Sequence, residues 1–248
     1  ALGEAPSAGS LPLAFAHAKL GSEAGWKPRI EAAERLARRG GISTSQLFSI
    51  YTERRPAASG GVWNRVEAVQ KFDVALLAGD VEGIEQSLLA VNRTLGRLDL
   101  VPEFANYYGE RLAAFDLSGP AEILAERIIA LSLYAEAAAM AGRLTAPVLV
   151  DLARGMSTVT HTGSDRLDAL LSAFQPSHTT PLPHRLETLL TDRRLGEAAL
   201  RALMLISSPT PDANDLEIAI RTLRRIGFEN DARKIALYFA VHELQEKS

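Results

Sequence analysis

The residues with the clearest chemical potential lie in one irregular segment, residues 51–65, with the sequence Tyr-Thr-Glu-Arg-Arg-Pro-Ala-Ala-Ser-Gly-Gly-Val-Trp-Asn-Arg. Its two adjacent arginines carry guanidinium groups, which bind carboxylates or phosphates through paired N–H donors. Its two glycines permit positive φ and can expose main-chain amides, which also bind anions. One interpretation is therefore an anion- or peptide-binding lip, with these candidate binding residues: Tyr51, Arg54, Arg55, Trp63 and Arg65.

The same segment has a structural interpretation. A proline, a run of small residues and two glycines between aromatic residues are also typical of a linker. In that case Tyr51 and Trp63 close over the core, and the loop only connects two helices. The sequence leaves both interpretations open.

Three histidines, His161, His178 and His184, lie close enough in the sequence to raise the question of a metal site. Their spacing does not place them on one helical turn, and no His-Glu-x-x-His pattern accompanies them. The chain has no cysteine, which excludes disulfides and thiolate metal ligands. We therefore expect solvated loop histidines and no metal site.

Catalytic patterns are absent from the sequence. It lacks the nucleophile elbow G-x-S-x-G and the phosphate-binding patterns G-x-x-x-x-G-K and G-x-G-x-x-G. Glu122 and Glu126 lie one helical turn apart, but without a sign of a cleft around them the pair is typical of a solvated surface. We predict no catalytic residue and no cofactor, and the sequence favours a protein without enzymatic activity.

The elements that must position the candidate segment are helices, and the pattern is clearest in residues 193–244. Apolar residues recur there at i, i+3, i+4 and i+7, the period of one buried helical face. They form three stripes: Leu195, Ala198, Ala199, Ala202, Leu203 and Ile206; Leu216, Ala219, Ile220 and Leu223; Ala232, Ile235, Ala236, Phe239 and Ala240. Because each helix has one narrow apolar face, we expect stacked helical hairpins with close approach at Ala199 and Ala202.

Similar stripes run through the rest of the chain, and no alternating β pattern persists. The expected helices include one from Val62 to Leu76, one beginning at Pro102 and one long apolar helix from Ala121 to Ala141. The repeat length is irregular, which excludes a regular tetratricopeptide array. The predicted fold is all-α, an irregular α-solenoid-like array of antiparallel helix pairs. A flexible arm over residues 1–10 precedes a single domain over residues 11–248, with a loop-rich excursion at about 155–185.

The net charge and the hydropathy of the chain argue against two kinds of partner, nucleic acid and the membrane interior. The net charge of −3 provides no basic field for nucleic acid, and no stretch approaches the roughly 20 apolar residues of a membrane span. The first ten residues lack the features of a signal peptide and are typical of a mature or trimmed N-terminus. Together with the absence of cysteine, this favours the periplasm, with the cytoplasm as the alternative.

Three segments carry a resemblance to known proteins: residues 51–63, residues 196–202 (Gly-Glu-Ala-Ala-Leu-Arg-Ala) and residues 223–233 (Leu-Arg-Arg-Ile-Gly-Phe-Glu-Asn-Asp-Ala-Arg). They resemble exported alphaproteobacterial proteins with irregular helical repeats. The architecture is also similar to the superhelical, non-catalytic region of soluble lytic transglycosylases. Those enzymes carry their catalytic acid in a Glu-Ser motif of a separate domain, and this chain has no Glu-Ser dipeptide. The resemblance therefore implies a scaffold.

Two functional hypotheses follow. The first is a non-enzymatic helical-repeat scaffold that binds a protein or a peptidoglycan-associated partner in the cell envelope. The alternative is a cell-wall glycan-acting enzyme, or the accessory domain of a lytic transglycosylase-like protein, with its site in the excursion. A groove lined by aromatic residues and arginine favours the first, and a perturbed carboxylate in a deep pocket favours the second.

Overall fold

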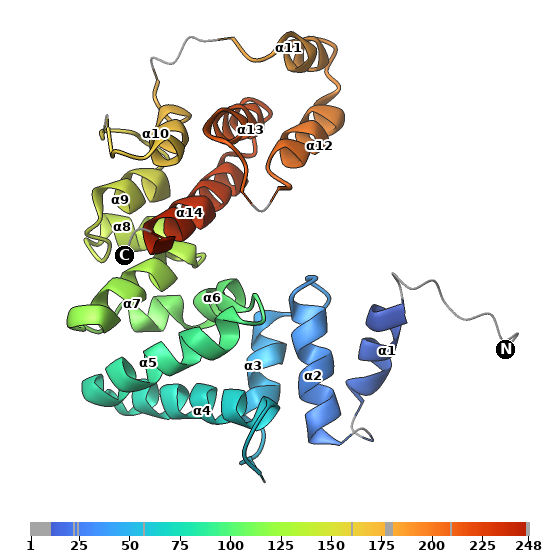
Figure 1. Cartoon of the computed structure of the whole chain (residues 1–248), viewed down its shortest axis with the longest axis vertical. Coiled ribbons are helices and arrows are strands. Elements are labelled where there is room, and N and C mark those ends of the chain that lie inside the picture. Colours follow the sequence, from blue (N-terminus) through green and yellow to red (C-terminus); the bar gives the residue numbers. More distant parts are fainter. Residues whose placement is uncertain are drawn as a thin grey trace, which may run out of the picture. The chain divides into compact units, whose positions relative to one another are not determined.

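A computed structural model of the chain describes residues 11–21, 23, 25–56, 58–159, 161–176, 181–208 and 210–246. Every regular element in these ranges is helical, in fourteen α-helices, which confirms the predicted all-α class (Figure 1). None of these helices is long and apolar enough to cross a membrane. The predicted N-terminal arm, residues 1–10, lies outside the described ranges.

The described residues group by their contacts into two compact units, one ending at Leu133 and the other beginning at Tyr134. Contact grouping identifies packing units and does not test independent folding. The expectation of a single domain over residues 11–248 therefore stays a prediction.

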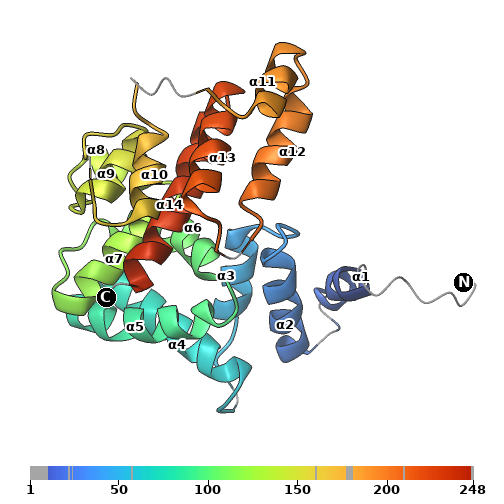
Figure 2. The same cartoon turned by 45° about the horizontal axis from the view of Figure 1, so that its top comes forward.

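The N-terminal unit is built from helices that pack mainly on their neighbours in the chain (Figure 2). Its helices are α1 (Leu11–Lys19), α2 (Trp26–Ala37), α3 (Thr44–Thr52), α4 (Val62–Ala78), α5 (Val81–Gly96), α6 (Val101–Leu112) and α7 (Gly119–Leu131). The α4–α5 pair is a tight hairpin, because Gly79 adopts the left-handed conformation that ends α4 and the Asp80 carboxylate accepts a hydrogen bond from the Gly83 amide, which caps α5.

Aromatic rings fill the centre of this unit. Phe48 of α3, Phe72 of α4, and Phe104 and Tyr108 of α6 are all fully buried. Their ring centroids lie 4.8 to 6.1 Å apart, the range in which aromatic pairs attract. The helices that carry the candidate segment, α3 and α4, are thus anchored to α6.

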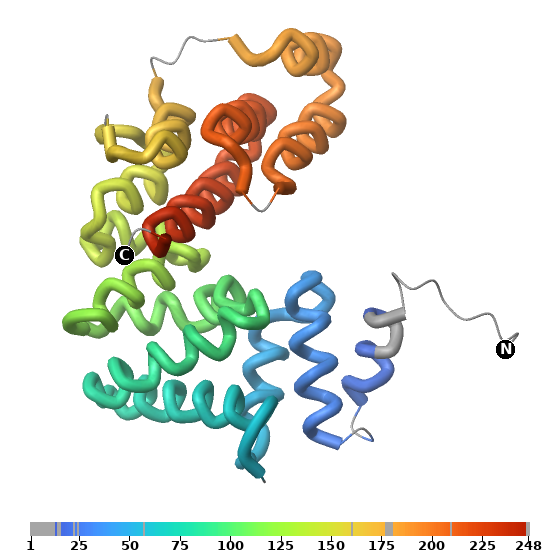
Figure 3. Tube along the Cα trace, viewed as in Figure 1, coloured from blue at the N-terminus to red at the C-terminus, as the bar shows by residue number. Residues whose placement is uncertain are grey.

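The C-terminal unit contains α8 (Ala135–Met140), α9 (Pro147–Arg154), α10 (Asp165–Ser172), α11 (His184–Thr191), α12 (Leu195–Leu205), α13 (Ala213–Arg225) and α14 (Glu229–Glu246). The trace in Figure 3 shows that α12, α13 and α14 follow one another as predicted. In addition α14 packs on α9, and α13 on α10, so the end of the chain returns to the start of the unit.

One predicted element is wrong. The apolar stretch from Ala121 to Ala141 forms two helices rather than one, because α7 ends at Leu131 and α8 begins at Ala135. Ser132 adopts an extended conformation, and the Leu133 amide donates a 3.1 Å hydrogen bond to the Asn106 side chain instead of continuing the helix. The break coincides with the boundary between the two units.

Candidate functional site

The predicted binding segment connects α3 to α4. α3 starts where the Ser43 hydroxyl accepts a hydrogen bond from the Gln46 amide, and it ends at Thr52. Gly60 and Gly61 then have φ values of +92° and +56°, conformations that favour glycine, before α4 begins at Val62. The expectation that these glycines take up positive φ is confirmed.

Two of the candidate residues belong to a buried network. The Tyr51 hydroxyl donates a 2.6 Å hydrogen bond to Glu34 Oε1, and Arg65 binds both carboxylate oxygens of Glu34 at 2.8 and 2.9 Å. Tyr51 is fully buried and Glu34 is 4% exposed. Burial, then the charge of Glu34 and the hydrogen bond to it, raises the pKa of Tyr51 well above its ordinary value. These groups join α2, α3 and α4 beneath the loop, and little of Tyr51 reaches solvent.

Trp63 also has a packing role. Its ring lies against Trp26 of α2, with 5.2 Å between the centroids, and it contacts the core while remaining half-buried. Trp26 in turn donates a 2.8 Å hydrogen bond from its indole nitrogen to the carbonyl of Ile50. The structural interpretation of the segment therefore describes Tyr51 and Trp63 well.

The arginine pair lies on the surface. The side chain of Arg54 is 63% exposed, and its Nε lies 3.2 Å from Glu53 Oε1. Glu53 also pairs with Arg29 at 2.9 Å, so one carboxylate is shared between two guanidinium groups. Arg55 is exposed and makes no ion pair within the described part of the chain. Arg54 is therefore only partly neutralised, and the positive charge of Arg55 has no partner among the described residues.

The backbone that carries these arginines is held from below. Gln70 of α4 donates hydrogen bonds from Nε2 to the carbonyl oxygens of Tyr51 and Arg54, at 2.8 and 2.6 Å. At the far end of the loop, the Gly60 amide donates a 2.8 Å hydrogen bond to the Asn64 side chain. Both ends of the loop are thus attached to α4.

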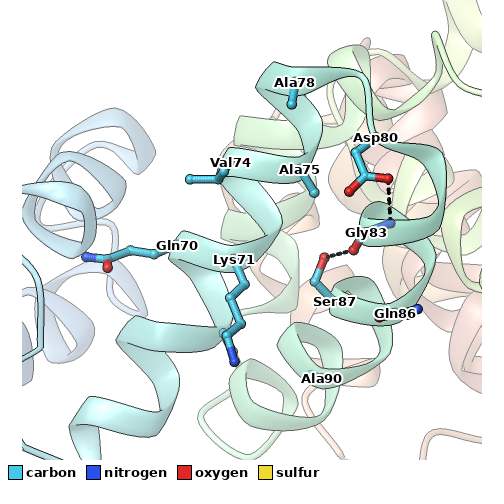
Figure 4. A pocket seen from close by; sticks show the side chains of 11 residues that line it. Gln70, Lys71, Val74, Ala75, Ala78, Asp80, Gly83, Gln86, Ser87 and Ala90 are labelled. Carbon is cyan, nitrogen blue, oxygen red and sulfur yellow. Dashed lines mark hydrogen bonds between the residues drawn. The ribbon is translucent and has the colours of Figure 1, made fainter.

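Gln70 also lines a groove over the α4–α5 hairpin, with a volume of about 630 Å³ (Figure 4). Small residues form most of it: Ala68, Ala75 and Ala78 from α4, and Gly83, Ser87 and Ala90 from α5. Val74, Lys71, Asp80 and Gln86 complete the lining. The groove contains no aromatic residue, so it differs from the aromatic-lined groove expected of a partner site.

The predicted excursion holds a set of hydrogen-bonded carboxylates. Buried Asp151 accepts bonds from the Thr158 amide and hydroxyl and from the Val159 amide, and so fixes the chain after α9. Asp168 accepts bonds from the Thr162 amide and hydroxyl and lies 2.6 Å from His161 Nδ1. These contacts fold the segment onto α9 and α10.

Two of the three histidines can be placed. The His161 side chain is 78% exposed, and His184 is an exposed residue at the start of α11. His178 lies outside the described residues. Within the described ranges no group of three or more His, Asp and Glu side chains is arranged to hold a metal ion.

The carboxylates with perturbed acidity do not form a catalytic pair. Burial by itself would raise the pKa of Asp168. Hydrogen bonds from Thr162 and His161 outweigh this effect and hold the pKa below its usual value. The hydrogen bond from Arg225, against the effect of burial, lowers the pKa of Glu187. Burial raises the pKa of Glu103 on α6, but this residue does not line the α4–α5 groove. None of these three carboxylates combines a raised pKa with a place in the α4–α5 groove, the combination expected of a general acid in that groove.

No protein-family model, curated protein or solved structure matches this chain. The resemblance to exported helical-repeat proteins and to the transglycosylase region therefore stays a prediction.

The sequence did not single out Glu34 or Gln70. Glu34 carried a usable signal, because it lies four residues after Ile30 and one after Ala33, in the apolar stripe of α2. A carboxylate at such a position needs a buried partner. Gln70 carried no comparable signal, because its role depends on where the α3–α4 loop folds back.

Proposed function

We propose that the protein is a non-enzymatic helical-repeat scaffold that binds a carboxylate-bearing protein or cell-envelope partner through the α3–α4 loop. The observation that carries the proposal is the pair of hydrogen bonds from Gln70 to the loop carbonyls beneath the exposed side chains of Arg54 and Arg55. A loop whose backbone is already fixed loses less conformational entropy on binding, so more of the interaction energy appears as affinity.

The chemistry of the two side chains selects the partner. Guanidinium groups bind carboxylates in a planar, bidentate geometry, and neither Arg54 nor Arg55 is fully neutralised by the described residues. Trp63 and Tyr51 support the loop from the core side, and Arg65 is engaged by Glu34. We therefore assign direct contact to Arg54 and Arg55, and a supporting role to Tyr51, Trp63 and Arg65.

The scaffold part of the proposal is an irregular, α-solenoid-like stack of antiparallel helix pairs. It is supported by the N-terminal unit, where α1 to α7 pack mainly on their chain neighbours. Stacked helical pairs present extended surfaces to partners and need no catalytic residue. The return of α14 to α9 in the C-terminal unit departs from a simple stack. We place the protein in the periplasm, where peptidoglycan and its associated proteins supply carboxylates.

The test measures how much partner the tagged chain, residues 1–248, captures from an envelope extract and, in a separate arm, how much isolated peptidoglycan it binds. The two arms distinguish a protein from a glycan-peptide source of carboxylates. The variant carries Arg54→Ala and Arg55→Ala. We expect it to capture less than about one tenth of the wild-type amount at 0.1 M salt, since two charge-assisted contacts are lost.

A matched control removes two exposed arginines elsewhere, Arg39→Ala and Arg154→Ala. This control has the same net charge as the test variant and should capture normally. If the wild-type chain enriches nothing over the control resin in either arm, the scaffold proposal is wrong. If the loop variant captures as much as the wild type, the site assignment is wrong.

The glycan-acting enzyme has no comparable support. Its expected site was the excursion at about 155–185, where the carboxylates of Asp151 and Asp168 are taken up by Thr158, Val159 and Thr162. In the α4–α5 groove the carboxylate is that of Asp80, which caps α5. Each of these carboxylates therefore has a structural role.

A further inference from the structure

Helix α12 exposes apolar side chains on the side that faces away from its neighbours. Its main packing partners are α11 and α13, and only Ala198 and Ala202 among its residues are buried (Figure 1). On the opposite side of the helix, Leu200, Leu203 and Met204 are 64%, 43% and 71% exposed. Large apolar side chains that gather on one exposed helical surface are typical of an interaction site.

The spacing of these residues matches the surface of a second helix. Gly196, Ala199, Leu200 and Leu203 lie at i, i+3, i+4 and i+7, the four positions that surround a hole into which a facing helix inserts a side chain. No heavy atom lies within 4 Å of the position that a Cβ on Gly196 would occupy, so the hole is open there. An extended peptide, whose side chains alternate, does not match this period. We call these four residues, together with Met204, the α12 face.

One border of the α12 face carries an excess of positive charge. The Glu197 carboxylate is shared by two arginines, because Arg194 Nη2 pairs with Oε2 and Arg201 Nη2 lies 2.8 Å from Oε1. Arg185 of α11 also acts on this carboxylate through its charge. Three guanidinium groups therefore face one carboxylate, an excess of two positive charges. We call Arg185, Arg194 and Arg201 the arginine border.

Neighbouring charges leave this excess in place. Asp192 and Arg193, in the turn between α11 and α12, are both exposed and cancel each other in net charge. Asp212 and Asp215 follow the other end of α12, where Asp212 caps α13. The arginines of α13 are each paired with a glutamate: Arg221 with Glu217, Arg224 with Glu229, and Arg225 with Glu187. The positive charge that lacks a partner is therefore confined to the arginine border.

We propose that the α12 face docks an amphipathic helix of a partner protein, whose apolar stripe covers the face and whose acidic flank lies along the arginine border. The apolar stripe fills the hole over Gly196 and removes the exposed leucines and Met204 from water. The acidic flank supplies the carboxylates that the border lacks. This surface belongs to the C-terminal unit, so the proposal does not depend on the loop arginines Arg54 and Arg55.

The charges and the spacing favour a protein helix over a lipid surface. An anionic lipid surface attracts the arginine border but repels Glu197, Asp212 and Asp215. Lipid chains also have no use for side chains spaced around a hole. A helix with acidic residues on one flank only satisfies the border without placing negative charge against the other end of α12.

The contact is small. The eleven residues of α12 span about 16 Å, so a single helix laid on this face buries less than a standard specific interface. We therefore expect a dissociation constant on the order of 100 µM.

The probe is an 18-residue helical peptide with a leucine stripe, glutamate on one flank and glutamine elsewhere. Its counterpart has lysine in place of glutamate, and circular dichroism confirms that both peptides are helical. Fluorescence anisotropy measures the binding of each labelled peptide to the chain, residues 1–248, at 0.1 M salt. The acidic peptide should bind at least about tenfold more tightly than the basic one, because only its flank complements the arginine border.

A variant with Leu200→Ser and Met204→Ser tests the apolar part of the contact. It should bind the acidic peptide at least about tenfold more weakly, since two large side chains no longer leave water on binding. The matched control carries Val74→Ser and Leu77→Ser on α4, where the two side chains are 65% and 71% exposed. The control should bind the peptide as the wild type does.

A second variant, with Arg185→Glu and Arg194→Glu, tests the charge. It should weaken binding of the acidic peptide and strengthen binding of the basic one, whereas Arg39→Glu with Arg154→Glu, at exposed positions elsewhere and with the same net charge, should do neither. Circular dichroism confirms that each variant is folded.

Failure of the acidic peptide to bind the wild-type chain at about 1 mM overturns the proposal, as does equal binding of the two peptides. Two further measurements identify another occupant. If the chain binds phosphatidylglycerol vesicles or self-associates in sedimentation equilibrium, and Leu200→Ser with Met204→Ser abolishes this while the peptide does not bind, the face belongs to a lipid surface or to a second copy. Either outcome overturns the assignment to an acidic helix.

Discussion

The Tyr51 hydroxyl donates a 2.6 Å hydrogen bond to Glu34 Oε1 and thereby joins the last turn of α3 to the last turn of α2. Arg65 closes the arrangement from α4 with two hydrogen bonds to the same carboxylate. A buried carboxylate is tolerated only where a cation and hydrogen-bond donors compensate for its lost hydration. The three side chains therefore fix the entry and exit of the α3–α4 loop.

Removing Arg65 should destabilise the protein strongly. Arg65→Ala leaves Glu34 buried and uncompensated, which typically costs about 3 kcal/mol in the free energy of unfolding. Tyr51→Phe removes a single hydrogen bond to a charged group and should cost about 1.5 kcal/mol. Urea unfolding followed by circular dichroism measures both. Arg39→Ala, at an exposed position just after α2, is the control, and a loss for Arg65→Ala no larger than for that control would contradict the buried network.

Because of Tyr51, the free energy of unfolding should depend on pH in the alkaline range. The pKa of Tyr51 is raised in the folded state, whereas an unfolded tyrosine ionises near pH 10. The unfolded state therefore loses its proton first, so the contribution of Tyr51 is full below about pH 10 and falls as the pH rises above it.

Because Tyr51→Phe has no proton to lose, the stability difference between wild type and variant should narrow between about pH 8 and pH 11. Urea unfolding at several pH values in this range measures the difference. Every other ionisable group is present in both proteins, so its contribution cancels in the difference. A difference that stays constant to about pH 11 would show that Tyr51 does not hold its proton in the folded state.

Local signals in the sequence indicate several of the helix boundaries. Ser43 caps α3, and the pair Gly79 and Asp80 ends α4 and caps α5, as their residue types predict. Gly227 has a φ of +91°, as expected for the residue that follows α13. These features depend on a few neighbouring residues, which is why the sequence alone reveals them.

Features that depend on distant residues could not be predicted in this way. The break after α7 requires Asn106 to capture the Leu133 amide across 27 residues. The position of the α3–α4 loop requires Gln70 beneath it. In both cases the side chain that decides the backbone path is an ordinary polar residue on a helix, without a distinctive local pattern.

Gly61 should be intolerant of substitution although it has space around it. Its φ of +56° and ψ of −122° lie in a region that residues with a Cβ rarely adopt, and no heavy atom lies within 4 Å of the position that a Cβ would occupy. Gly61→Ala should therefore cost about 1–3 kcal/mol through backbone strain alone. Gly196→Ala, in the helical backbone of α12 and equally open, is the matched control and should be neutral or stabilising by up to about 1 kcal/mol. Comparing the melting temperatures of Gly61→Ala and Gly196→Ala separates the cost of backbone strain, which only Gly61→Ala introduces, from the effect of adding a methyl group.

Ala202 is fully buried on α12, the helix that packs on α13, as its stripe predicts. Two other members of the predicted stripe, Leu195 and Leu203, are instead exposed at 44% and 43%, so the buried face of α12 is narrower than its sequence indicates. Ala202→Leu should overpack this contact and cost about 1–3 kcal/mol. Leu200→Ala on the same helix is the control, because Leu200 is 64% exposed and should change stability by less than about 0.5 kcal/mol. Equal melting temperatures for wild type and Ala202→Leu would show that the two helices separate at this point.

Substitution of Gln70 should reduce both the stability of the protein and the order of the loop, whereas substitution of the two loop arginines should change neither. Replacing Arg54 and Arg55 by Ala should leave the free energy of unfolding within about 0.5 kcal/mol of wild type, because neither side chain holds the loop in place. Gln70→Ala keeps both charges but removes two hydrogen bonds to the loop carbonyls, and should cost about 1 kcal/mol.

Amide hydrogen exchange in residues 53–55 should therefore accelerate in Gln70→Ala and stay unchanged in the arginine variant. If the loop backbone positions the guanidinium groups, Gln70→Ala also weakens partner capture although the net charge is preserved. Gln86→Ala, on the opposite wall of the groove, is the matched control. Capture that survives Gln70→Ala at wild-type strength would mean that the arginines bind as mobile charges, and that the hydrogen bonds beneath them serve the fold alone.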